Sequence, residues 1–303
     1  MKGLSRSDFC GLKKLDESAL SVFENFMKFS WLSLPVYFHS VFSLMGLGNF
    51  YYVIIRDCLV VFRYKKMYSN TSLILYFAPV HRSNDKNMER EVLGALLYAG
   101  FSARITQSEL DWLGVSLSKT RAGNQPTYSE FIYSADKSVQ MKGKKYLKIR
   151  NLVNKFNSSG GVVTRGLELW VPGFIDSWAK AKKIRYHQYI DFLVSFPERF
   201  LFTCLMLDGV PMGFTAVELV GQFYCQIVSI VNYEAPFHVG PALHFHTMKA
   251  LPEGSLVTSG AGVWRGLIDQ KRELRPVVEE KVYRIPSLGL VQNAYELVKD
   301  FLK

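Results

Sequence analysis

The sequence predicts an α/β fold with mixed sheets, built as two domains of one architecture. Strand-like runs of β-branched and aromatic residues alternate with segments of helical spacing along the whole chain. Each half contains a strand hairpin, a further strand and a helix, although no sequence repeat is strong enough to prove a duplication. A polar stretch at 120–130 with Gly123 and Pro126 reads as a linker, so we expect domains over 1–125 and 126–303.

The composition sets the broad class. With 303 residues, 49% apolar and 14% aromatic, the chain is large enough for two domains and can bury a core, which excludes a disordered protein. A net charge of +11 indicates an anionic partner such as nucleic acid, a membrane surface or anionic metabolites. The four cysteines lie far apart without a CxxC pair, which favours buried thiols in a reducing compartment, and therefore a cytoplasmic protein, over a disulfide or zinc framework.

The first domain opens with a segment too polar for a signal peptide. Residues 30–55 then carry no formal charge, and their length alone allows a membrane span. Pro35, His39 and Gly46 interrupt this run, so we favour a buried amphipathic helix followed by a loop and a strand. We therefore expect no integral membrane span.

The rest of the first domain reads as strands and one helix. A β-branched and aromatic run at 50–64 has an Arg-Asp pair at its centre and predicts a hairpin. A buried strand is expected at 72–80. Helical spacing at 87–101 predicts a helix that ends at Gly100, a typical C-cap.

The second domain begins with a strongly basic helix and continues as an alternation of helices and strands. The Asp208-Gly209 pair between two apolar runs predicts a second hairpin. The expected elements are a basic helix at 142–156, an interrupted helix at 174–196, strands at 199–220 and 222–233, a polar helix at 264–274, a strand at 277–285 and a closing helix at 290–303.

The basic helix has two distinct faces. On a helical projection of 144–156 the apolar residues gather on one face and the basic ones in an opposite stripe. An ordinary solvated face mixes signs, because like charges at i,i+4 spacing destabilise a helix, so the absence of acidic residues favours phosphate binding over solvation. The docking face comprises Tyr146, Ile149, Leu152, Val153 and Phe156. The expected nucleic-acid or phosphate-binding residues are Lys142, Lys144, Lys145, Lys148, Arg150, Asn154 and Lys155, with Arg272 and Arg275 further along the chain.

Two motifs resemble a known family. Residues 130–156 contain Gly143, Lys144, Lys145, Tyr146, Arg150, Asn151, Asn154 and Phe156 in an ordered pattern. This pattern resembles one in the C-terminal domain of phosphatidylglycerol lysyltransferases and their soluble relatives. A weaker match at 265–276 contains Gly266, Leu267, Lys271 and Pro276.

The resemblance implies a tandem fold of two acetyltransferase-like (GNAT) domains. It also implies transfer of an aminoacyl group from aminoacyl-tRNA to an amine or hydroxyl acceptor, with the basic helix at RNA phosphates or at an acceptor's phosphate. The chain departs from the family in two respects: the membrane portion of the best-known members is absent, and 258–265 lacks the acidic residues that precede the second motif. A lipid acceptor and peripheral membrane contact are therefore not favoured, and either the catalytic roles have moved or the acceptor chemistry differs.

A segment at 237–242 partly matches the turn that holds the coenzyme A pyrophosphate in acetyltransferases. Gly240 and Ala242 fit that turn as cofactor-binding residues, whereas Phe237 replaces a polar residue and Pro241 offers no N–H group to a phosphate. The pattern disfavours acetyl-CoA and agrees with an aminoacyl donor, so we expect no bound cofactor.

Three histidines in the same region raise the question of a metal site. His244 and His246 are two residues apart and point to different sides of a helix, so they cannot share one ion. His238 adds no clear ligand spacing. We expect no metal.

Four residues are candidates for catalysis. Glu218 in an apolar strand is a candidate base whose pKa burial would raise, although a carboxylate at the end of a strand fits equally. Asp269 is a second candidate base. Lys271 would stabilise developing charge or bind the tRNA end, with an ordinary exposed lysine as its alternative. Tyr233 follows a strand where such folds open their sheet.

Four functions remain open at this point. The leading one is an aminoacyl-tRNA-dependent transferase. The second is an amino-acid or acyl transferase that modifies a base in DNA, for example viral DNA. An acetyl-CoA-dependent N-acetyltransferase and a non-catalytic nucleic-acid-binding protein are the others, and the partner is tRNA or DNA in the first two.

Overall fold

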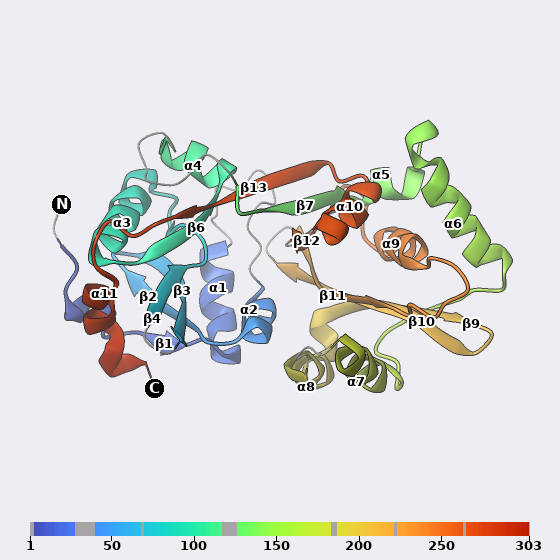
Figure 1. Cartoon of the computed structure of the whole chain (residues 1–303), viewed down its shortest axis with the longest axis horizontal. Helices are drawn as coiled ribbons and strands as arrows, with labels where there is room; N and C mark the ends of the chain where they lie inside the picture. The colour runs from blue at the N-terminus through green and yellow to red at the C-terminus, as the bar shows by residue number, and fades with distance from the viewer. Residues whose placement is uncertain are drawn as a thin grey trace. The chain divides into compact units, whose positions relative to one another are not determined.

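The chain forms two compact units. The computed structural model describes residues 3–27, 40–67, 70–116, 126–182, 187–220, 223–262 and 265–302. Unit 1 comprises Met1–Tyr37, Ser43–Ser129 and Glu280–Lys303, and unit 2 comprises Phe38–Phe42 and Glu130–Glu279 (Figure 1). The sequence assigned residues 126–303 to one domain, whereas in the structure the last 24 residues, Glu280–Lys303, cluster with unit 1.

Unit 1 is built around a mixed sheet in the order β1-β2-β3-β4-β6-β13. The predicted hairpin is confirmed, because β2 and β3 pair antiparallel on either side of Arg56 and Asp57, both of which have positive φ. The strands are β1 (Lys13–Lys14), β2 (Phe50–Ile55), β3 (Cys58–Met67), β4 (Asn70–Leu75), β5 (Val80–His81), β6 (Ser102–Thr106) and β13 (Val278–Ile285). The helices are α1 (Leu20–Met27), α2 (Val41–Leu47), α3 (Lys86–Ala99), α4 (Gln107–Leu113) and α11 (Val291–Val298).

Helices α3 and α11 cover one face of this sheet and form the core of unit 1. Val92 and Leu96 of α3 and Val298 of α11 pack with the sheet residues Phe62 and Ile105, and all five are fully or almost fully buried. The Asp85 side chain caps α3 by accepting from two backbone N–H groups, and the helix ends at Gly100 as predicted. The apolar spacing and the caps thus fix both the length and the packed face of α3.

Unit 2 is built around strands that pair in the order β7-β12-β11-β10-β9-β8, with both parallel and antiparallel neighbours. Its hairpin between β9 and β10 turns at Asp208-Gly209, again as predicted. The strands are β7 (Tyr128–Ser134), β8 (Val162–Arg165), β9 (Phe200–Leu207), β10 (Val210–Val220), β11 (Phe223–Val231) and β12 (Leu256–Gly262). The helices are α5 (Ala135–Gln140), α6 (Leu147–Ser158), α7 (Val171–Lys182), α8 (His187–Ser195), α9 (Gly240–Lys249) and α10 (Arg265–Glu273).

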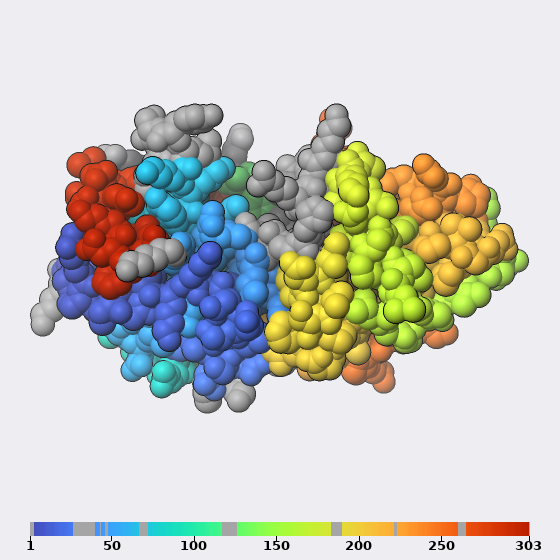
Figure 2. Space-filling model, turned by 90° about the horizontal axis from the view of Figure 1, so that it is seen from below, coloured from blue at the N-terminus to red at the C-terminus, as the bar shows by residue number. Residues whose placement is uncertain are grey.

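Helices cover both faces of the β8–β11 part of this sheet. Helix α9 lies on one face and helices α7 and α8 on the other (Figure 1), and Figure 2 shows α7 and α8 side by side. On the α9 side, Phe156 of α6 packs with Leu205 and Leu243. On the other side, the Phe174 ring of α7 stands edge-on to Phe214 of β10. The sheet is therefore buried on both faces, as its apolar strands predict.

The basic helix docks as its periodicity predicts. Helix α6 buries Ile149, Val153 and Phe156, and Tyr146 is buried directly before it. Its lysines lie on the exposed side. The apolar face therefore belongs to the core and leaves the basic stripe for solvent or a partner.

Two expectations about apolar and thiol groups have mixed outcomes. The uncharged run resolves into α2 and β2 at its C-terminal end, while its residues 30–39 lie outside the described residues. Within the described ranges, no helix has the length and apolarity to cross a membrane. Cys58, Cys204 and Cys225 are buried free thiols as expected, but Cys10 is exposed because it follows a short surface 3₁₀ turn.

Two glycines that end helices in unit 1 provide a matched test of this packing. Gly100 and Gly114 both have positive φ, but a Cβ on Gly100 would lie 2.1 Å from the Leu290 carbonyl oxygen, whereas a Cβ on Gly114 would approach only the Lys86 Nζ, at 4.0 Å. We expect Gly114→Ala to lower the free energy of unfolding by about 1–2 kcal/mol from backbone strain. Gly100→Ala should cost about 1–3 kcal/mol more because of the clash. Urea unfolding measures both, and equal losses would show that the α3 end does not pack against Leu290.

Candidate functional site

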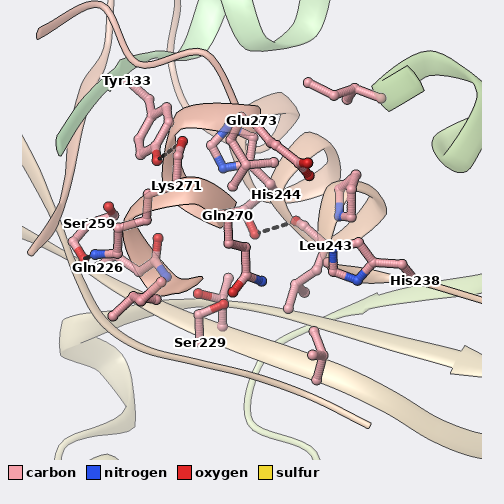
Figure 3. Close-up of a pocket in the computed structure, with 18 of the residues that line it drawn as sticks. Tyr133, Gln226, Ser229, His238, Leu243, His244, Ser259, Gln270, Lys271 and Glu273 are labelled. Atoms are coloured by element: carbon pink, nitrogen blue, oxygen red, sulfur yellow. Dashed lines mark hydrogen bonds between the residues drawn. The ribbon is translucent and has the colours of Figure 1, made fainter. Parts of the chain in front are cut away.

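A cavity of about 330 Å³ lies within unit 2. Helices α6, α9 and α10 and strands β10, β11 and β12 contribute to its walls. Figure 3 labels lining residues from β7, β11, β12, α9 and α10. Polar side chains from several elements converge on it: Gln226, Ser229, His238, His244, Gln270, Lys271 and Glu273. A concave site with a few converging polar groups is the usual form of a ligand-binding site.

The cavity lies where β11 runs on past its pairing with β12. The two strands pair in parallel at Tyr224–Val257 and Cys225–Thr258. Beyond these pairs, β11 residues from Gln226 onward line the cavity. The sheet therefore contributes strand residues to the cavity wall instead of a continuous packed surface.

A β-bulge lies at the same place on the other side of β11. Ala216 of β10 is opposite Val228, but its neighbour Val217 is opposite Gln226, so Ile227 is an extra residue in β11. A bulge leaves the extra residue outside the regular ladder and re-aims nearby backbone groups. Ile227 lines the cavity, so the bulge lies at its wall.

Lys271 is the most strongly perturbed cation of the cavity. Its Nζ donates to the Ser259 carbonyl of β12 and lies 5.7 Å from the Phe131 ring centroid. Burial lowers the pKa of Lys271 to about 8, while the nearby Glu130 and Cys225 act in the opposite direction. The Tyr133 hydroxyl donates to the Lys271 carbonyl at 2.8 Å and so holds this turn of α10 in place. Lys271 is thus a partly desolvated cation in a fixed position.

Two of the three histidines of α9 and its preceding loop line the cavity, and the third faces α6. His244 lines the cavity, its Nε2 lies 3.2 Å from the Ser138 hydroxyl, and burial lowers its pKa to about 4. His238 also lines the cavity, and burial again lowers its pKa. His246 pairs with Asn157 instead. Within the described ranges, no three metal-ligating side chains gather at one point.

The structure places the four predicted catalytic residues differently with respect to the cavity. Lys271 and Tyr233 line it, with Tyr233 exposed at the rim and the Lys182 Nζ 4.2 Å from its ring centroid. Glu218 is buried opposite Cys225 and accepts a hydrogen bond from the Ser40 hydroxyl, outside the cavity wall. Asp269 is exposed on α10, 4.0 Å from Arg265.

The predicted phosphate-binding residues fall into two groups. Four of them make polar contacts within the protein: Lys148 pairs with Glu273 at 2.8 Å, Arg150 donates to the Met141 and Gly143 carbonyls, Arg272 pairs with Glu279, and Arg275 donates to the Lys145 carbonyl. The acidic partners come from α10 and from β13, which the sequence of the basic helix does not contain. The remaining residues of the set are exposed: Lys142, Lys144, Lys145, Asn154 and Lys155.

The turn that resembles a coenzyme A cradle does not fit a pyrophosphate. Gly240 lines the cavity, but the His238 ring fills the space beside it, since a Cβ there would lie 2.8 Å from the His238 Cε1. Pro241 occupies the first turn of α9 and has no N–H group. Ala242 is completely buried in the core. The turn therefore lacks the run of accessible N–H groups that a pyrophosphate requires.

Sequence reasoning missed several cavity residues that share a helix face with Lys271. Leu267, Gln270 and Leu274 line the cavity together with Lys271, and their spacing of three and four residues marks one face of α10. This periodicity was available in the sequence. Glu273 and His238 were missed because their positions depend on how α6, α9 and α10 come together.

Comparisons with known proteins find the fold but no sequence relative. No protein-family model matches the chain, and no curated protein does. A conserved protein of unknown function from Bacteroides thetaiotaomicron is similar in structure, with a TM-score of 0.71, 16% identity, and coverage of 91% of this chain and 99% of that one. The C-terminal domain from Agrobacterium fabrum assigned to a lysylphosphatidylglycerol synthetase has a TM-score of 0.59, 15% identity, and coverage of 91% and 96%.

An acetyltransferase of the GNAT family shares the architecture as well. The protein, from Colwellia psychrerythraea, has a TM-score of 0.57 and 8% identity, and the match covers 91% of this chain and 99% of that one. These likenesses confirm the predicted fold class, an α/β fold with acetyltransferase-like (GNAT) architecture.

The lowered pKa of Lys271 has a consequence for stability. Below pH 8 the ammonium is charged in both folded and unfolded chains, so its burial penalty is fully present. Between pH 8 and its ordinary pKa of 10.5, the unfolded chain binds a proton that the folded chain does not, and the free energy of unfolding rises with pH. We expect Lys271→Met to remove this rise and the exposed Lys281→Met to keep it, as measured by urea unfolding at pH 7, 8.5 and 10. Parallel curves for all three proteins would contradict a desolvated Lys271.

Proposed function

We propose that this protein is an acyltransferase that moves an aminoacyl group from aminoacyl-tRNA to an amine or hydroxyl acceptor in the cavity of unit 2. The observation that carries the proposal is the cavity beyond the β11–β12 pairing, with the bulge at Ile227 on one wall and the Lys271 ammonium on another. The fold shared with the lysylphosphatidylglycerol synthetase domain and the two matched sequence motifs support the same reaction class.

The cavity offers the groups that acyl transfer needs. The acceptor nitrogen or oxygen attacks the ester carbonyl, a new bond forms to the carbonyl carbon, and the bond to the ribose oxygen breaks. Negative charge develops on the carbonyl oxygen, where the Lys271 ammonium stabilises it. With a pKa of about 8, Lys271 is mostly charged near pH 7. Because its ammonium is already largely removed from water, little solvent has to reorganise when it stabilises the developing charge.

We assign His238 as the base that accepts the acceptor's proton. Burial lowers the pKa of His238, so the imidazole is neutral near pH 7 and can accept a proton. Figure 3 shows His238 and Lys271 on different sides of the cavity. The acceptor proton passes to His238, and the resulting imidazolium returns it to the leaving ribose oxygen, so no net proton is taken up or released.

The surroundings of the cavity favour a nucleic-acid donor over coenzyme A. The α9 turn does not fit a pyrophosphate, because Pro241 has no N–H group and the His238 ring packs against Gly240. Lys148 and Leu152 connect the cavity wall to α6, where Lys155 is exposed, and Lys144 is exposed in the short turn directly before that helix. Exposed cations on this helix suit the phosphates of an RNA whose aminoacyl end enters the cavity.

The test uses tRNA charged with a mixture of ¹⁴C-labelled amino acids. The protein is incubated with it and, separately, with DNA, with phosphatidylglycerol vesicles or with the small molecules of a cell extract. We expect label to appear in one acceptor fraction and RNase treatment of the donor to abolish it. Lys271→Gln should slow transfer by about 10²–10³-fold through loss of charge stabilisation.

The exposed Lys249→Gln on α9 serves as the matched control and should leave the rate unchanged. Turnover of acetyl-CoA in place of charged tRNA would refute the proposal that aminoacyl-tRNA is the donor. An unchanged transfer rate for Lys271→Gln would refute the assignment of the cavity as the site of the reaction.

A further inference from the structure

Unit 1 carries a row of arginines on the sheet face opposite its main core. Strand residues alternate between faces, and the neighbours Phe62, Leu75 and Ala103 belong to the core on the α3 side. The opposite face therefore carries the residues between them. Its register places Arg63 of β3 beside Ile74 of β4, Ile74 beside Ser102 of β6, and Arg104 of β6 directly opposite Arg284 of β13. We call Arg63, Arg104 and Arg284 the arginine row.

Aromatic rings hold the central arginine of the row in place. The Arg104 guanidinium carbon lies 4.1 Å from the Tyr76 ring centroid and 4.7 Å from that of Tyr128. The Arg104 Nε is sealed from solvent and has no hydrogen-bond partner among the described residues, yet the side chain as a whole is partly exposed. The guanidinium is thus fixed in orientation, and its outer Nη end remains for a ligand. Arg63 stacks in the same way at 5.7 Å from the Phe50 ring centroid.

No residue that the structure describes balances the charges of Arg104 and Arg284. Like charges directly opposite each other on a sheet are destabilising. Across the described ranges, neither arginine forms an ion pair with a carboxylate. The buried carboxylates of unit 1 are used elsewhere: Glu109 accepts from Ala78 N–H, Glu280 from Ser108 N–H, and Glu89 from the Trp112 indole. An arrangement that costs stability and is kept rigid is typical of a binding site.

We propose that the arginine row binds phosphates of a single-stranded nucleic acid. The fixed guanidinium fork of Arg104 matches a phosphate, and arginine binds phosphate through paired hydrogen bonds. Strand spacing puts Arg63 and Arg104 about 12 Å apart, because two strand intervals combine with an offset of two residues along β6, and this is enough for more than one phosphate. The row alternates cations with tyrosine and phenylalanine rings, the composition that single-strand binding surfaces use. Part-buried, clamped arginines suit a strand that threads among side chains better than a flat lipid surface.

The site is separate in its residues from the cavity and from the lysines of α6, all of which belong to unit 2. It adds a nucleic-acid contact that the proposed transfer reaction does not require. Binding can therefore be measured without any assay of transfer.

The test measures binding of a fluorescein-labelled 20-nucleotide single-stranded RNA by anisotropy at several salt concentrations. We expect Arg284→Gln and Arg104→Gln each to weaken binding about 5–10-fold and to reduce the slope of log K against log salt by about 0.7, the value for one phosphate contact on a single strand. The control is Arg90→Gln, an exposed arginine of α3 on the other side of unit 1, and it should stay within two-fold of the parent protein.

The outcomes separate the alternatives. Equal binding by all three variants overturns the proposal. If the Arg104→Gln and Arg284→Gln variants keep RNA binding but lose binding to phosphatidylglycerol-containing vesicles, the proposal is also overturned, and the arginine row is a membrane-binding surface. If Arg104→Gln lowers the urea midpoint, its loss of binding could come from unfolding, and the result for the exposed Arg284→Gln then decides whether the proposal holds. RNA binding lost in Arg284→Gln but intact in Lys271→Gln supports the site whether or not transfer is detected.

Discussion

The hydrogen bond from the Lys271 Nζ to the Ser259 carbonyl is the interaction on which the cavity depends. Ser259 follows Thr258, where β12 pairs with Cys225 of β11, and Gln226 of β11 then turns to line the cavity. The lysine therefore stands next to the place where the two strands meet. Its ammonium is anchored there, partly desolvated, and directed by the Tyr133 contact to the same helical turn. Helix α10, strand β12 and the bulged strand β11 are thus joined at this part of the cavity.

Positive charge is used in distinct ways in the two units. In unit 2, Lys148 and Arg150 are tied to Glu273 and to backbone carbonyls, so they fix the basic helix and its preceding turn as much as they attract a ligand. In unit 1, Arg104 and Arg284 stand opposite each other without carboxylate partners among the described residues. The net charge of +11 is therefore partly structural and partly available, and the available part includes a face that composition alone does not locate.

Local features of the fold could be predicted from the sequence, whereas contacts between distant segments could not. The two hairpins turn at Arg56-Asp57 and Asp208-Gly209 because those short segments carry their own turn preference. The docked face of α6 follows from helical periodicity alone. The Lys148–Glu273 pair joins residues 125 positions apart, so no pattern within the basic helix reveals it. The return of Glu280–Lys303 to the first unit could not be predicted for the same reason, because it depends on contacts with residues far away in the sequence.

The candidate site shows the same division. Lys271 was found through a sequence motif, and its face of α10 follows from helical spacing. Glu218 was chosen for its apolar surroundings, but the side of a strand that faces a cavity depends on bulges such as that at Ile227. Asp269 lies on the same helix as Lys271, yet it points to Arg265 and solvent.

Filling the cavity tests its role most directly. Ser229 lines it on an exposed part of β11, so Ser229→Trp places an indole in the space without disturbing the core. Ser158→Trp at the exposed end of α6 is the matched control. The measurement is transfer of label from charged tRNA, with the urea midpoint and RNA binding followed in parallel. The account predicts that Ser229→Trp loses transfer by on the order of 100-fold while stability and RNA binding persist. Full transfer by a folded Ser229→Trp protein would contradict it.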